Sequence, residues 1–320
     1  MKKTLSVILG TALILAAVLS LGACTPKEKV YNVGICQLIQ HTALDAASQG
    51  FQDALKKILG EDKVVFDYQN ASGEQTNCTT IINSFVSKKV DLIMANATPA
   101  LQAAYNATSE IPVLGTSITE YSVALNLENF NGTVGGNVSG TSDLAPLDQQ
   151  AELITELFPE AKTVGLVYCS AEPNSDYQVK KVTEYLEAKN ITCTRFAFSD
   201  SNDIAAVVTS AAASSDVIYI PTDNTAAAST ETIRNIIVPA GVPAITGEEG
   251  ICAGCGVATL SISYYDLGYK TGEMAAKILK GEAKVSEMAI EYAPAVKKYN
   301  AELAAEYNVE IPEGFEAISE

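Results

Sequence analysis

The chain has 320 residues and a formal net charge of −17, from 38 acidic and 21 basic side chains. Its basic residues form no cluster beyond short lysine pairs, so we expect no nucleic-acid partner, because phosphates require a positively charged surface. For the same reason we do not expect binding to an anionic lipid surface by charge alone. The length suffices for two domains of ordinary size.

The first residues have the pattern of an export and anchoring signal. Two lysines precede an apolar stretch from Leu5 to Leu21. Gly22 and Ala23 follow this stretch, directly before Cys24. This pattern is typical of a secretory signal peptide, here residues 1–23. Cys24 resembles the lipidated cysteine of a bacterial lipobox, and residues 24–30 form a polar tether. An uncleaved membrane helix is the alternative, but the stretch is at the short limit for a span. We expect an extracytoplasmic protein, lipid-anchored to the bacterial cell membrane through Cys24.

An even number of cysteines remains after Cys24. In an exported chain they permit disulfides with 15 possible connectivities. The six are Cys36, Cys78, Cys169, Cys193, Cys252 and Cys255. Cys169 and Cys193 lie at ends of predicted neighbouring strands, so they could pair. Cys252 and Cys255 form a lone CxxC motif without the further ligands that zinc requires. We expect a local disulfide or free thiols there, and no metal.

Apolar strand patterns alternate with amphipathic helix patterns through the first half of the chain. The predicted strands are 33–36, 64–66, 91–94 and 112–114, and the predicted helices are 42–59, 74–87 and 99–106. Continuous apolar strands separated by helices predict a parallel sheet that is covered on both faces.

The same series recurs in the second half. The predicted strands are 164–168, 193–198, 216–220 and 243–245, and the predicted helices are 175–189, 202–213 and 225–237. Three pairs of equivalent residues recur at nearly equal spacing, namely Gly34 and Gly165, Asp91 and Asp216, and Pro112 and Pro243. The repeat predicts two similar doubly wound α/β lobes.

The lobes are expected to be joined by several strands. A Gly/Asn/Ser-rich segment, 131–143, is a candidate hinge. A later strand at 258–262, a helix at 265–280 and a last strand and helix near 290–307 would cross back between lobes. We assign 31–142 plus 258–282 to the N-terminal lobe and 143–257 plus 283–320 to the C-terminal lobe. Two such lobes can close over a ligand.

Ligands of parallel α/β sheets bind beyond the carboxyl ends of the strands, where helices begin. The predicted helix starts carry capping residues, of which most bind nothing. They are Thr98 followed by Pro99, Thr42 with Asp45 as a capping box, Asn174 with Ser175, and Thr222 with Asp223 and Asn224. A hydroxyl and free N–H groups at Thr98 would suit a carboxylate, and Asp223 would suit an ammonium group. Together they predict an amino-acid zwitterion between the lobes.

Further candidates follow other strands. His41, the sole histidine, lies in the first strand–helix loop, where it lines the cleft or bonds locally. Glu248 or Glu249 offers a second ammonium anchor, or is an exposed loop charge. Tyr264 and Tyr265 offer an aromatic wall, although tyrosines before a helix more often serve packing.

Several stretches resemble the type I solute-binding proteins of the tryptophan/tyrosine ABC-transporter family. The similarity extends over roughly Val33 to Glu282. Its distinctive stretches are 41–46 (HTALDA), 66–71 (FDYQNA), 97–100 (ATPA), 140–144 (GTSDL), 219–224 (YIPTDN) and 264–268 (YYDLG). Ordered matches of this kind are far more specific than a single motif.

The resemblance implies a two-lobed periplasmic-binding-protein fold and, in some members, an aromatic amino acid as ligand. The family-type contacts that it implies are Thr98, Pro99, Ala100, Ser142, Asp143, Asn174, Ser175, Thr222, Asp223 and Asn224. The Gly-Glu-Glu turn at 247–249 departs from the Ser-Asp-Thr-like turn expected of the family, which affects the size of the pocket. The resemblance also implies a monomer that serves an ABC permease and its ATPase.

Other functions agree less well with the sequence. No GxSxG, Walker or HExxH motif is present, so we expect neither an enzyme nor a cofactor. A ligand-sensing receptor of the same fold is an alternative, as is another solute such as a nucleoside or sugar. The absence of tryptophan and the presence of only two arginines, Arg195 and Arg234, disfavour a sugar.

Overall fold

The computed structural model describes residues 29–318, and Tyr31–Glu320 forms one compact unit. The predicted signal peptide, 1–23, and the lipidation site, Cys24, lie outside the described residues. Within 29–318, no helix has both the length and the apolar character that a membrane crossing requires.

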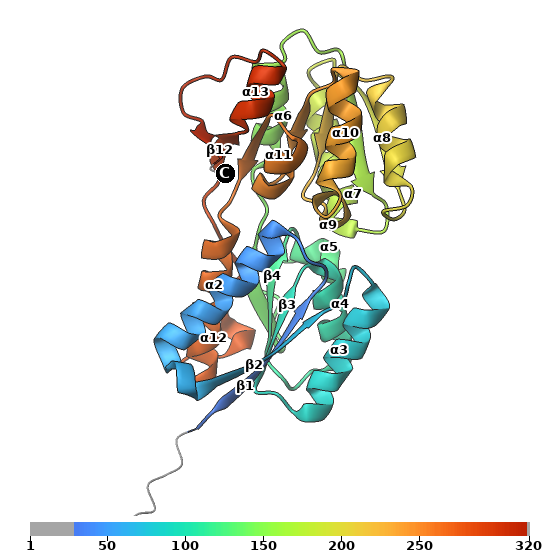
Figure 1. Cartoon of the computed structure of the whole chain (residues 1–320). Coiled ribbons are helices and arrows are strands. Elements are labelled where there is room, and N and C mark those ends of the chain that lie inside the picture. Colours follow the sequence, from blue (N-terminus) through green and yellow to red (C-terminus); the bar gives the residue numbers. More distant parts are fainter. Residues whose placement is uncertain (1–28, 319–320) are drawn as a thin grey trace, which may run out of the picture. The chain divides into compact units, whose positions relative to one another are not determined.

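Two sheets organise this unit (Figure 1). The first has the strand order β11-β5-β4-β3-β1-β2, and every pairing in it is parallel. Its strands are β1 (Tyr31–Gln37), β2 (Val64–Asn70), β3 (Leu92–Asn96), β4 (Val113–Ile118), β5 (Val138–Ser142) and β11 (Glu291–Tyr292). The helices around it are α2 (Thr42–Leu59), α3 (Gln75–Lys88), α4 (Thr98–Ala107), α5 (Tyr121–Leu125) and α12 (Tyr264–Leu279), with short 3₁₀ turns η1 (Glu61–Lys63) and η2 (Val285–Glu287).

The second sheet has the order β13-β12-β10-β9-β8-β6-β7, with one antiparallel pairing, between β10 and β12. Its strands are β6 (Thr163–Cys169), β7 (Thr192–Phe198), β8 (Val217–Ile220), β9 (Ala244–Thr246), β10 (Ala258–Ser261), β12 (Val296–Tyr299) and β13 (Glu316–Ala317). Its helices are α6 (Leu147–Leu157), α7 (Pro173–Glu187), α8 (Ile204–Ala212), α9 (Asn224–Ala227), α10 (Thr230–Ala240), α11 (Glu249–Cys255) and α13 (Ala301–Glu306). The predicted fold class, two similar doubly wound lobes joined by a multi-strand hinge, is confirmed.

Strand β3 shows why the strands read as continuous apolar runs. Leu92 and Met94 pack into the core under α2 and α12, whereas Ile93 and Ala95 pack into the core under α3 and α4. All four side chains are fully buried. A parallel strand with helices on both faces therefore needs apolar residues at every position.

The internal repeat extends to individual hydrogen bonds. Asp91 precedes β3, and its carboxylate accepts a hydrogen bond from the backbone N–H of Asn32 at 2.8 Å. Asp216 precedes β8, and its carboxylate accepts bonds from the N–H groups of Lys162 and Thr163, both at 2.8 Å. In each lobe the aspartate thus fixes the start of the neighbouring central strand.

The chain passes between the sheets at three places within the described residues. These places are 143–146 after β5, 262–263 after β10, and 293–295 after β11. The Gly/Asn/Ser-rich segment 131–143 is therefore not itself the crossing: β5 occupies most of its second half and pairs with β4. Only its last residue, Asp143, lies where the chain changes sheet.

The last quarter of the chain divides between the lobes differently from the prediction. We expected 258–282 in the N-terminal lobe, but β10 pairs with β9 and extends the second sheet before the chain crosses. We expected 283–320 in the C-terminal lobe, but β11 pairs with β5 in the first sheet. Both strands cover a sheet edge that would otherwise present unpaired backbone groups.

Two predictions about local structure are wrong for reasons of geometry. Cys169 and Cys193 lie in neighbouring strands, but the parallel register places Cys169 opposite Phe198. Five residues separate Phe198 from Cys193, which is about 16 Å along a strand and far beyond disulfide reach. All six cysteines of the described chain are free thiols. The predicted helix 225–237 is split into α9 and α10. The CxxC segment lies in helix α11.

Helix α12 packs against α2 with almost no space between the backbones. A Cβ atom at Gly268 would collide with the carbonyl oxygen of Ala47, and one at Gly50 would collide with the carbonyl oxygen of Tyr265. Backbone atoms of two packed helices cannot move aside as a flexible side chain can. The glycines therefore allow α12, which follows a crossing from the second sheet, to dock on the first lobe.

We expect Gly268→Ala to destabilise the protein by roughly 1–3 kcal/mol, the usual cost of overpacking a close contact. Alanine is intrinsically the better helix former by about 1 kcal/mol, so a net loss would show that the contact with α2 outweighs propensity. Chemical denaturation measures the change. The exposed substitution Lys277→Ala in the same helix is the control, and a Gly268→Ala protein as stable as this control would contradict the packing argument.

Candidate functional site

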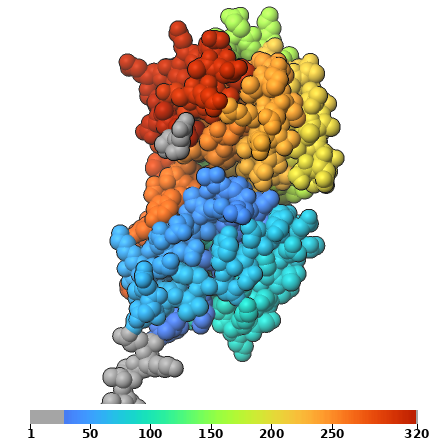
Figure 2. Space-filling view, in the orientation of Figure 1, coloured from blue at the N-terminus to red at the C-terminus, as the bar shows by residue number. Residues whose placement is uncertain are grey.

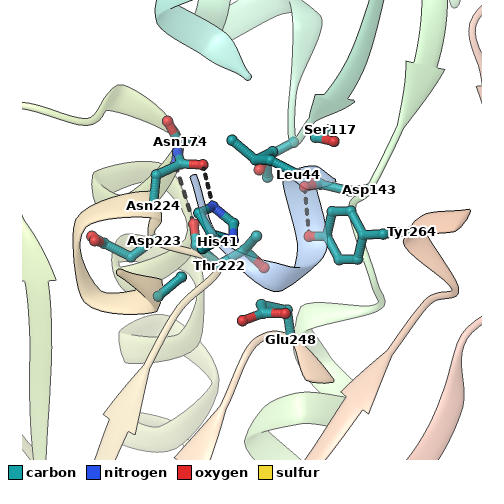
Figure 3. Close-up of a pocket in the computed structure, with 12 residues that line it drawn as sticks. His41, Leu44, Ser117, Asp143, Asn174, Thr222, Asp223, Asn224, Glu248 and Tyr264 are labelled. Atoms are coloured by element: carbon teal, nitrogen blue, oxygen red, sulfur yellow. Dashed lines mark hydrogen bonds between the residues drawn. The ribbon is translucent and has the colours of Figure 1, made fainter. Parts of the chain in front are cut away.

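The carboxyl ends of the strands of both sheets face one narrow cavity, whose volume of about 10 Å³ leaves room for roughly one water molecule (Figure 3). Ser117, Asp143 and Tyr264 lie on one side, and Asn174, Asp223 and Asn224 on the other, with His41 between them. The residues that line it are His41, Leu44, Ser117, Thr119, Asp143, Asn174, Thr222, Asp223, Asn224, Ala227, Glu248 and Tyr264. In the space-filling view, the surface of α2 in the first lobe meets the orange surface around α11 in the second lobe (Figure 2). The cleft between the lobes is therefore covered on the face that this view shows.

Asp143 stands at the end of β5, where the chain leaves the first sheet. Its Oδ2 accepts a hydrogen bond from the hydroxyl of Tyr264 at 2.9 Å, whereas its Oδ1 has no partner. Burial raises the pKa of this carboxyl to about 6, although the Tyr264 hydroxyl acts in the opposite direction. A buried carboxylate with a free oxygen is a ready partner for a cation.

Asp223 and Glu248 also line the cavity, but backbone N–H groups already bind their oxygens. Asp223 accepts bonds from the N–H of Ala226 at 2.8 Å and of Cys169 at 2.7 Å. Glu248 caps α11 by accepting bonds from the N–H of Gly250 at 2.6 Å and of Ile251. Burial is the main cause that raises the pKa of each carboxyl to about 7. Of the three carboxyls that line the cavity, Asp143 alone has an oxygen without a partner within residues 29–318.

His41 links the two lobes across the cavity. Its Nε2 lies 3.3 Å from Oδ1 of Asn224, at the start of α9. Burial lowers the pKa of the imidazole, against the opposing effect of Asn224. His41 thus acts as a neutral hydrogen-bonding group and supplies no positive charge to balance the carboxylates.

Unpartnered polar atoms gather in this cavity. Ser117 Oγ, Asp143 Oδ1 and Asn174 Oδ1 are three of the six buried side-chain atoms that lack a hydrogen-bond partner within residues 29–318. Each such atom costs free energy unless a further group supplies its bond. The cavity is therefore built to receive a polar molecule, and two of the three atoms can only accept.

Seven of the predicted site residues line the cavity, namely His41, Asp143, Asn174, Thr222, Asp223, Asn224 and Glu248. Five do not: Thr98, Pro99, Ala100, Ser142 and Ser175. Pro99 lines a neighbouring hollow, and Ala100 is part of the core. The Ser142 hydroxyl is engaged locally, donating to the carbonyl of Thr119 and accepting from the N–H of Leu144. Ser175 is fully buried behind Asp223.

Three predicted helix caps are wrong. The N-cap of α7 is Glu172, so Asn174 and Ser175 lie inside the helix. The N-cap of α4 is Ala97, with φ of 88°, so Thr98 is the first helical residue and its hydroxyl caps nothing. The N-cap of α2 is His41, and Asp45 accepts a bond from Gln37 at 2.7 Å instead of closing a capping box with Thr42.

The sequence prediction missed Leu44, Ser117, Thr119 and Ala227, and it treated Tyr264 only as a candidate wall. Ser117 has a φ of 56°, in the left-handed region that serine seldom adopts, within β4 where the register with β5 shifts between Gly115 and Ile118. No residue pattern signals that conformation. Tyr264 carried a signal, since it immediately follows a predicted crossing. Within residues 29–318 no group of His, Cys, Asp or Glu is arranged to hold a metal ion.

Comparisons with known proteins agree with this geometry. Residues 32–318 match the family described as ABC transporter substrate binding protein. The tyrosine-binding protein of Clostridioides difficile strain R20291 is 38% identical over 261 residues, which cover 81% of this chain and 75% of the relative.

Two solved structures of relatives cover nearly the whole chain. An ABC domain from Streptococcus pneumoniae in complex with L-Trp is 33% identical, with a TM-score of 0.85 over 91% of this chain and 100% of that chain. The ligand-free, open structure of a substrate binding protein with adhesive properties from Clostridium difficile is 37% identical, with a TM-score of 0.69 over 90% of this chain and 99% of that chain. The predicted resemblance is confirmed: the chain belongs to the ABC transporter substrate-binding protein family and is a substrate-binding protein of an ABC transporter.

Proposed function

We propose that this protein captures an aromatic amino acid in the cavity between its lobes, outside the cell membrane, and delivers it to an ABC permease driven by its ATPase. The observation that carries the proposal is Asp143, a buried carboxyl with one free oxygen at the hinge. The α-ammonium group of an amino acid supplies both the charge and the hydrogen-bond donors that this oxygen lacks.

Two further observations support an aromatic amino acid. One relative is a tyrosine-binding protein, and another was solved with L-Trp. Leu44, Ala227 and the ring of Tyr264 supply the apolar part of the cavity lining. An apolar wall beside a few polar groups is typical of small-molecule sites.

The anchoring proposal rests on the N-terminal segment. The apolar stretch and Cys24 fit a lipidated exported protein that remains at the membrane surface near its permease. Mass spectrometry of the membrane fraction tests it. A Cys24→Ala chain that remains membrane-bound would show that a lipid on this cysteine is not the anchor.

Thermal unfolding with added amino acids tests the ligand class. We expect L-tyrosine or L-tryptophan to raise the melting temperature, because a ligand that binds only the folded state stabilises it. Sugars and nucleosides serve as controls and should leave the melting temperature unchanged. A shift with a sugar and none with an amino acid would contradict the proposal.

We expect Asp143→Asn to weaken binding of the aromatic amino acid at least about tenfold, since the buried ammonium loses its counter-charge. Calorimetry measures the affinity. Asp148→Asn, an exposed change in the first turn of α6, is the matched control and should bind normally. An unchanged affinity in Asp143→Asn would remove Asp143 from the site.

The raised pKa of Asp143 predicts a pH dependence of binding. An ammonium group beside this carboxyl lowers its pKa below the value of about 6 that it has in the empty cleft. At a pH between these two pKa values, Asp143 carries a proton in the ligand-free protein but not in the complex. Binding of the ligand therefore releases this proton. Affinity should therefore fall as the pH falls through this value and level off above it. Calorimetry on both sides of the pKa checks the effect, which should shrink in Asp143→Asn.

A further inference from the structure

Glu172 lies directly behind the wall that the second lobe contributes to the cavity. It follows β6, precedes Pro173 at the start of α7, and is only 5% exposed. Oε1 accepts bonds from the N–H of Thr225 at 3.0 Å and from its hydroxyl at 2.9 Å. Oε2 accepts a bond from the N–H of Asn224 at 3.0 Å. Since a backbone N–H donates to each oxygen, both oxygens act as acceptors.

The same carboxylate fixes the orientation of two amide side chains. Asn224 Nδ2 donates to Glu172 Oε2 at 2.7 Å, and Asn174 Nδ2 donates to the same oxygen at 3.2 Å. An amide oxygen has no hydrogen to donate to the carboxylate of Glu172, so the nitrogen of each amide must point toward Glu172. Both amide oxygens are consequently turned away from Glu172. Asn174 has a second such restraint, because its Nδ2 also donates to the carbonyl of Thr222 at 3.1 Å.

The orientation of Asn224 determines the hydrogen on His41. Asn224 Oδ1 can only accept, and it lies 3.3 Å from His41 Nε2. The imidazole must therefore carry its hydrogen on Nε2 to make this bond across the cleft. On the same wall, Asn174 Oδ1 stays without a partner.

We propose that Glu172 is a positioning residue that sets the hydrogen-bond polarity of this wall. By holding the amide nitrogens of Asn174 and Asn224, it presents their oxygens as acceptors, one to the ligand and one to His41. The wall therefore favours a ligand that donates hydrogen bonds, an amine in its ammonium form, over an analogue of equal size without the amine. This selectivity rests on the proposed amino-acid ligand, whereas the orientation of Asn224 and His41 does not.

The ligand-free protein tests the orientation. His41 is the sole histidine, so protein labelled with ¹⁵N-histidine gives a single pair of imidazole nitrogen signals. We expect the Nε2–H form in the natural chain. In Glu172→Gln the new side-chain amide can donate as well as accept, so Asn224 can turn over and the signal should change to a mixture of the two forms. The Nδ1–H form in the natural chain, or an unchanged signal in Glu172→Gln, would overturn the proposal.

Ligand discrimination tests the consequence. Affinities are measured by calorimetry for L-tyrosine and for 3-(4-hydroxyphenyl)propionate, which lacks the amine. We expect the ratio of the two affinities to fall about threefold in Glu172→Gln, because Asn174 keeps only the Thr222 carbonyl to hold its amide nitrogen and presents its oxygen to the ligand for only part of the time. A natural chain that binds neither compound refutes the proposed ligand but leaves the histidine signal as an independent test. A Glu172→Gln protein that binds L-tyrosine with an unchanged ratio overturns the positioning role.

Asp216→Asn is the matched control for both measurements. Asp216 is also a carboxylate of the second lobe that accepts several bonds, from the N–H groups of Lys162 and Thr163, but at the opposite end of β6. Its loss should lower the melting temperature and leave the ratio and the histidine signal unchanged. A loss of discrimination in both variants would show that general destabilisation, and not Glu172, causes the effect.

Discussion

Burial of acceptor groups in the cleft is the constraint on which the other features of the site depend. The carboxyls of Asp143, Asp223 and Glu248 are all buried, and burial raises the pKa of each. Helix starts supply backbone N–H donors to Asp223 and Glu248, so these two groups are largely satisfied from within the chain. Asp143 accepts only the Tyr264 hydroxyl at Oδ2, and its Oδ1 has no partner within residues 29–318. The carboxyl of Asp143 therefore lacks a hydrogen-bond donor and a positive counter-charge, and a ligand can supply both.

The free acceptor stands on the hinge itself. Asp143 is the first residue after β5, and Tyr264 is the first residue of α12, so the 2.9 Å bond between them joins two of the segments that cross between the sheets. A cation that binds Asp143 is therefore bound to the hinge as well as to the lobes. In the proposed function, the ammonium group that binds Asp143 thus contacts a hinge segment, where two-lobed proteins open and close. The close packing of α12 on α2 through Gly50 and Gly268 holds one end of that hinge firmly to the first lobe.

The fold was accessible from sequence because its signals are local and repeated. Each strand is apolar throughout, each covering helix is amphipathic, and both recur in the same order in the two halves. Most predicted strands and helices begin and end within about two residues of those in the structure, but β2 and β4 extend beyond their predicted ends at 66 and 114, to Asn70 and Ile118. The assignment of 258–261 and 291–292 to the wrong sheets has a different origin. A strand next to a crossing pairs with whichever sheet the chain has reached at that point, and that depends on the arrangement of both sheets in space.

Sequence alone determined that this chain folds as twin parallel-sheet lobes, that ligand contacts follow the strands, and that His41, Asp143, Asn174 and the 222–224 turn are candidates. Only the tertiary structure decided what each of them does. The carboxylates of Asp143 and Asp223 look alike in sequence, yet one has a free oxygen and the other is bound by two N–H groups. Glu172 has no sequence signal, because its role depends on Asn224 and Thr225, which lie far along the chain. Hydrogen-bond partners are set by distances in space, and a residue pattern records only distances along the chain.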